Sequence, residues 1–119
     1  MSGNVLIISN KSPFDHAAIK EALDMALIYA AIDQEVSWLF TQHAVLALDA
    51  KLNPSMLGLK DSFKQLKTLE IYDVENVYVC AEALARFNLD SGNLSIPVIA
   101  LESDAIRSLI AKQDMVVTL

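Results

Sequence analysis

The chain has 119 residues and a formal net charge of −6, with nine Lys and Arg against fifteen Asp and Glu. This length predicts one domain over residues 1–119, and the 54% hydrophobic content excludes intrinsic disorder. The acidic balance, without a basic block, excludes nonspecific duplex binding, so no direct contact with nucleic acid is expected. A small domain with this apolar excess is expected to bury part of its surface under partner subunits.

The first residues and the cysteine count bear on where in the cell the protein is expected to be. Met1-Ser2-Gly3-Asn4 lacks the charged start and cleavage site of a signal peptide, and the longest apolar run, over 25–32, is too short to cross a bilayer. We therefore expect a cytoplasmic protein with no membrane contact. Cys80 is the one cysteine, which excludes an internal disulfide, a paired-cysteine redox motif and a thiolate zinc site.

Short β-branched apolar runs predict strands, and longer stretches with helical apolar spacing predict helices between them. Ser12 and Ser103 fit helix N-caps, and Pro13 fits a first helical position. The expected strands cover 4–9, 35–40, 76–80, 96–101 and 115–119, and the expected helices cover about 13–32, 42–49, 60–72, 81–87 and 103–112.

Alternating strands and helices predict right-handed βαβ crossovers. The expected fold class is α/β, a three-layer α/β/α sandwich on a mostly parallel five-stranded sheet. Reactive groups in such sheets lie at the carboxyl ends of the strands, near the switch in strand order. That rule draws attention to residues 9–15, 40–43, Cys80 and 101–103.

Cys80 ends the third predicted strand and directly precedes a predicted helix. Backbone N–H groups at a helix N-terminus stabilise anions, so a thiolate or persulfide would be favoured there. A cysteine that closes an apolar strand is also commonly a small buried hydrophobe, and that interpretation stays open. Arg86 completes the Cys-x5-Arg spacing of cysteine phosphatases, but the intervening residues lack glycine and favour a helix over a phosphate loop.

The sequence supports other candidate sites less well than it supports Cys80. No glycine-rich loop follows a strand, and His16 and His43 lack metal-ligand spacing, so neither a cofactor nor a metal is expected. Lys60, Lys64 and Lys67 share one face of a predicted helix. This lysine stripe is interpreted as a solvated face, with a docking patch for an acidic partner or tRNA as the alternative.

The first predicted helix carries two apolar stripes. One stripe fits the core of the domain and consists of Ile19, Leu23, Ala26 and Ala30. The second would stay exposed if one side of the helix packs on the sheet, and it consists of Met25, Ile28, Tyr29 and Ile32. We predict that this second stripe is an interface with another subunit.

The segment over 69–84, LEIYDVENVYVCAEAL, resembles the helix, YD-[IV]-E turn, strand and Cys-Ala-x-x-Leu of the DsrE/DsrF-like family. Within that family the resemblance is greatest to the TusC/DsrF type of subunit. Weaker matches over 23–27 and 101–107 extend the resemblance over essentially the whole chain. It implies the DsrE version of the flavodoxin-like sandwich.

This resemblance implies a sulfur-relay heterohexamer, a dimer of heterotrimers with TusB/DsrH-like and TusD/DsrE-like subunits. The Tus branch passes persulfide sulfur through a downstream acceptor protein toward 2-thiolation of the tRNA wobble uridine, and the Dsr branch serves dissimilatory sulfur oxidation. The carrier cysteine belongs to the TusD/DsrE subunit, so the role implied here is mainly structural and non-catalytic. Cys80 occupies a position like that carrier's, which makes a persulfide site at Cys80 the alternative.

Overall fold

A computed structural model describes residues 3–12, 18–49, 76–94 and 97–119. Its elements are β1 (Asn4–Ser9), α1 (Ala18–Ala31), β2 (Glu35–Phe40), the 3-10 helix η1 (Gln42–Leu48), β3 (Asn76–Cys80), α3 (Ala81–Arg86), the 3-10 helix η4 (Ser91–Asn93), β4 (Ile99–Leu101), α4 (Ser103–Ala111) and β5 (Met115–Thr118). All five expected strands are present. The expected helix over 60–72, with its lysine stripe of Lys60, Lys64 and Lys67, lies outside the described residues.

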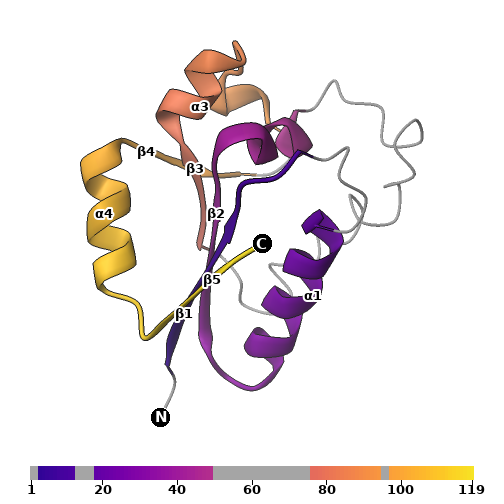
Figure 1. The fold of residues 1–119 in the computed structure, drawn as a ribbon, viewed down its shortest axis with the longest axis vertical. Coiled ribbons are helices and arrows are strands. Elements are labelled where there is room, and N and C mark those ends of the chain that lie inside the picture. The colour runs from indigo at the N-terminus through magenta and orange to yellow at the C-terminus, as the bar shows by residue number, and fades with distance from the viewer. Residues whose placement is uncertain (1–2, 13–17, 50–75, 95–96) are drawn as a thin grey trace.

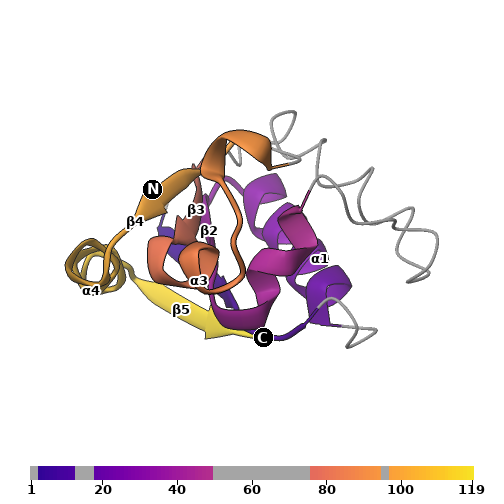
Figure 2. The same ribbon diagram turned by 90° about the horizontal axis from the view of Figure 1, so that it is seen from above.

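The five strands form one sheet in the order β4-β3-β2-β1-β5, and every pairing is parallel. Strands β1 to β4 follow one another in one direction, and the chain then returns across the sheet to place β5 beside β1. Right-handed crossovers require the returning helix to lie on the face opposite the first helix. Figures 1 and 2 show α1 and α4 on opposite sides of the sheet. This confirms the α/β fold class, with helices on both faces of a wholly parallel sheet.

The main core lies between the sheet and α1. Side chains alternate between the two faces of a strand, and the odd-numbered residues of β1 pack with the even-numbered residues of β2. Trp38 and Phe40 are fully buried and stack with ring centroids 4.5 Å apart. The residues that α1 buries are Ala18, Ile19, Ala22, Leu23 and Ala26.

The opposite face of the sheet is covered less completely. Leu6 and Leu39 are buried there, but α4 contributes no buried residue. Large apolar side chains stay exposed on α4, at Ile110, and on the strands before and after it, at Ile99 and Val116. Helix α4 has nine residues, and this is too short to cover the whole of this face of a five-stranded sheet.

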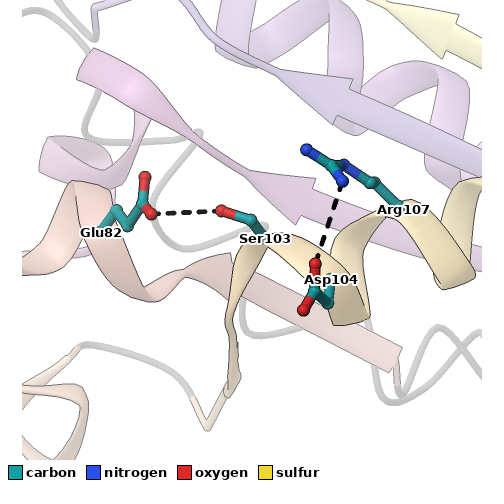
Figure 3. A network of polar contacts seen from close by, with 4 residues as sticks. All are labelled: Glu82, Ser103, Asp104 and Arg107. Atoms are coloured by element: carbon teal, nitrogen blue, oxygen red, sulfur yellow. Dashed lines mark hydrogen bonds and ion pairs between the residues drawn. The ribbon is translucent and has the colours of Figure 1, made fainter.

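Three expected details differ in the structure, which are the type of one helix, the start of one strand and the cap of another helix. The expected helix over 42–49 is the 3-10 helix η1. Strand β4 begins at Ile99, two residues after Pro97, and residue 96, where the strand was expected to begin, lies outside the described residues. The expected Ser103 cap is wrong, since Glu102 is the N-cap of α4 and makes no side-chain cap bond. Ser103 is the first residue of α4, and its hydroxyl donates to Glu82 Oε1 at 3.1 Å (Figure 3).

Candidate functional site

Cys80 stands where strand becomes helix without an intervening loop. It is the last residue of β3 and the N-cap of α3, with extended φ and ψ of −73° and 118°. The local sequence explains this junction, because β-branched and aromatic residues favour the strand and the following Ala-Glu-Ala-Leu-Ala favours a helix. Cys80 is a free, half-buried cysteine whose side chain makes no cap hydrogen bond.

A cavity of about 480 Å³ adjoins the cysteine. Its lining residues come from the turn after β2 and from the β3–α3 junction, and they are Thr41, Gln42, Cys80, Glu82, Ala83 and Arg86. Strands β2 and β3 are parallel neighbours, so their carboxyl ends lie side by side and bring the two groups of residues together. Two of the segments to which the strand-end rule drew attention, 40–43 and Cys80, therefore contribute to one cavity.

Gln42 gives this cavity one of its walls through an uncommon backbone conformation. Its φ is 51°, in the left-handed region that residues other than glycine seldom adopt. The chain turns there from the end of β2 into η1. The turn places Thr41 and Gln42 against the cavity instead of extending β2 past Cys80.

The charged groups on the cavity are Glu82 and Arg86, which are one helical turn apart on α3 and exposed. Glu82 also accepts the Ser103 hydroxyl, which connects α3 to the start of α4 (Figure 3). Helix α3 has six residues, so its dipole is short. Stabilisation of an anion at Cys80 would depend on the first backbone N–H groups of α3 and on Arg86.

Arg86 is a lining residue that the sequence interpretation did not assign to the site. The Cys-x5-Arg spacing relates it to Cys80 in the sequence, but the residues between them do not fit a phosphate loop. Residues 81–86 are helical, which agrees with that exclusion. The helix nevertheless brings Arg86 to the same cavity as Cys80.

The remaining sequence candidates near the strand ends have structural roles or are placed elsewhere. Ser9 is buried and accepts a hydrogen bond of 2.9 Å from Trp38 Nε1, so its hydroxyl is used within the core. His43 is exposed and lies against Phe87, with ring centroids 5.3 Å apart. His16 lies outside the described residues.

The second apolar stripe of α1 remains largely accessible. Ile28 is 61% exposed and Ile32, just after the helix, is 58% exposed. Met25 and Tyr29 are half-buried on the same side. Tyr29 also donates from its hydroxyl to Met115 Sδ at 3.5 Å, a contact with β5 that the apolar spacing of the helix does not predict. The assignment of these residues as an interface stays a prediction.

Among residues 3–12, 18–49, 76–94 and 97–119, no cluster of three or more His, Cys, Asp or Glu side chains is arranged to hold a metal ion. Over the same ranges, no helix combines the length and apolar character needed to cross a membrane.

Comparisons with known proteins agree with this architecture. The model of the DsrE/DsrF-like family matches residues 3–119. The Protein TusC homolog of Pseudomonas aeruginosa is 35% identical over 119 residues, which is the full length of both chains. Protein TusC of Escherichia fergusonii is 28% identical over 113 residues, covering 94% of this chain and 95% of that protein.

A solved structure shows the same fold at low sequence identity. The crystal structure of the ychN protein from E. coli superposes with a TM-score of 0.81 over 100% of both chains, at 16% identity. Because the family model spans nearly the whole sequence and a full-length relative exceeds 30% identity, this chain belongs to the DsrE/DsrF-like family.

Proposed function

We propose that this chain is a mainly structural subunit of a sulfur-relay complex that passes persulfide sulfur toward 2-thiolation of the tRNA wobble uridine. The observation that carries the proposal is the full-length match to the Protein TusC homolog of Pseudomonas aeruginosa. The proposal sets the complex in the cytoplasm, where the tRNA is modified. Transfer to tRNA would pass through a downstream acceptor protein, since the net charge of −6 disfavours direct tRNA binding.

The partners in this proposal are one TusB/DsrH-like and one TusD/DsrE-like subunit, arranged with this chain as a dimer of heterotrimers. The stripe formed by Met25, Ile28, Tyr29 and Ile32 supports an obligate assembly, because a monomer would leave Ile28 and Ile32 in water. An aspartate at Ile28 would place a charge in that interface, which costs several kcal/mol when the charge has no partner. The Ile28→Asp variant should therefore fold but leave the complex.

Cys80 has a secondary role in this proposal. The TusD/DsrE type of subunit supplies the carrier cysteine, and the half-buried Cys80 has a short helix beside it. The alternative is that Cys80 carries sulfur itself, and the cavity of about 480 Å³ favours it by leaving room beside the thiol. In that case the Cys80 thiolate attacks the outer sulfur of a donor persulfide, R–S–SH, to form Cys80–S–SH and release R–S⁻.

A second alternative keeps the same assembly and changes the pathway. The Dsr branch uses a similar subunit, of the DsrF type, in dissimilatory sulfur oxidation. The acceptor protein distinguishes the two pathways, and the chain's own residues do not. Genes for thiouridylase-relay proteins beside this one would favour tRNA thiolation, and genes for sulfite reductase would favour sulfur oxidation.

The experiment is native mass spectrometry of the complex isolated from the protein's own cells, with identification of each subunit. A six-chain complex with two similar small subunits, and loss of 2-thiouridine when the gene is deleted, would support the proposal. Complementation with Cys80→Ser then separates the roles, because restored 2-thiouridine fits a structural subunit and failed restoration in an intact complex fits a carrier. A homo-oligomer without related partners would refute the subunit assignment.

A further inference from the structure

The exposed stripe of α1 continues onto the edge of the sheet. Met25, Ile28, Tyr29 and Ile32 follow helical spacing, and the hydrogen bond from the Tyr29 hydroxyl to Met115 Sδ brings β5 against them. Met115 is itself 41% exposed. We call these five residues the α1–β5 patch. It combines a helix face and a sheet edge, so it is larger than the stripe that the sequence indicates.

Carboxylates border this patch at both ends. Glu21 and Asp24 precede Ile28 by two turns and one turn of α1, and both are exposed. Asp33 directly follows Ile32, and Asp114 directly precedes Met115. Both are exposed, and the Asp114 carboxylate also accepts the Asn4 N–H at 2.8 Å. Lys20 is the one basic residue of α1. Within the described part of the chain, the patch therefore has an apolar centre and a border of predominantly negative charge.

This charge pattern discriminates between possible occupants. A second copy of this chain would bring carboxylates against carboxylates, on a molecule that already carries a net charge of −6. Like charges that face each other across an interface oppose the wrong partner, and opposite charges favour the right one. A nucleic acid would meet the same repulsion from its phosphates.

We propose that the α1–β5 patch binds a different protein chain, whose contact face has an apolar centre and a border of Lys and Arg. This inference rests on the proposed function in one respect, which is that it takes the partner to be a related subunit of the same complex. The apolar centre supplies the affinity, and the charged border selects the partner and speeds its association.

The test uses the complex reassembled from the purified full-length chain and the subunits found with it in cells. The border variant is Glu21→Lys/Asp24→Lys. Its matched control is Glu102→Lys/Asp104→Lys, which reverses two exposed charges at the start of α4, on the other side of the sheet. Far-UV circular dichroism and the fluorescence of buried Trp38 confirm that each variant is folded.

At low salt the border variant should bind roughly tenfold more weakly than the natural chain, and the difference should shrink as added salt screens the border charges. The control should bind like the natural chain. A Lys or Arg to Glu change on the partner's contact face should restore binding of the border variant. Equal binding of border variant and natural chain at low salt would overturn the inference, as would self-association of the natural chain that Ile28→Asp abolishes.

The two proposals can fail separately. If related subunits assemble with this chain but reversal of the border charges has no effect, the inference about the partner's charge is wrong and the proposed function stands. If the protein bound at the patch is unrelated to this family and its binding shows the expected salt and charge dependence, the docking inference stands and the proposed function is wrong.

Discussion

The hydrogen bond between Trp38 and Ser9 gives a direct measure of how the core holds β1 against β2. Both residues are buried, and the indole Nε1 donates to Ser9 Oγ at 2.9 Å. In Ser9→Ala the indole N–H loses this acceptor inside the core, where no water replaces it. An unsatisfied buried donor costs about 1–3 kcal/mol. At roughly 4 °C per kcal/mol for a chain of this size, the melting temperature should fall by about 4–12 °C.

The assay is guanidinium unfolding followed by the fluorescence of Trp38, the one tryptophan of the chain, at fixed protein concentration. Ser108→Ala is the matched control, because Ser108 is exposed on α4 and alanine favours a helix. A cycle with Trp38→Phe, followed by circular dichroism, isolates the pair, and the coupling should be about 0.5–3 kcal/mol. Equal stability of Ser9→Ala and the natural chain would show that the bond does not stabilise the core.

Two further predictions concern the core and the turn at the cavity. Leu23→Ala should lower the free energy of unfolding by about 2–5 kcal/mol, because Leu23 is fully buried between α1 and the sheet, and denaturant unfolding measures this loss. Gln42→Gly should raise stability by roughly 0.5–1 kcal/mol, since glycine adopts the φ of 51° without a steric penalty. A lower midpoint of thermal unfolding in Gln42→Gly would contradict that reasoning.

The sequence predicts the strands of this fold well, because a β-branched apolar run is a local signal. The run over 4–9 became β1 at the expected bounds, and that over 35–40 became β2. Contacts between distant parts of the chain were not predictable in this way. Ser103 is an ordinary capping residue by type, but its hydroxyl goes to Glu82, which is 21 residues earlier.

For the candidate site too, features set by neighbouring residues could be predicted from the sequence, and contacts made only in the folded chain could not. Cys80 and Arg86 are six positions apart, but their Cys-x5-Arg spacing does not fit a phosphate loop, and only the structure places both residues on one cavity. The contact of Tyr29 with Met115 spans 86 residues, so the stripe on α1 could be predicted and its continuation onto β5 could not. The rule of right-handed crossovers gives the fold class but not the strand order.

The cavity beside Cys80 does not lie at the switch point in strand order. In open α/β sheets, ligands enter where the strand order reverses, which here is between β1 and β5. Backbone pairing continues past the end of β5, since Leu119 N donates to Ile8 O at 2.9 Å and Asn10 N donates to Leu119 O at 3.3 Å. At the end of β1, the Ser9 hydroxyl already accepts a hydrogen bond from Trp38 Nε1. Within the described residues the backbone hydrogen bonds of Leu119 hold the ends of β1 and β5 together, and the cavity beside Cys80 lies at the carboxyl ends of β2 and β3, next to the turn at Gln42.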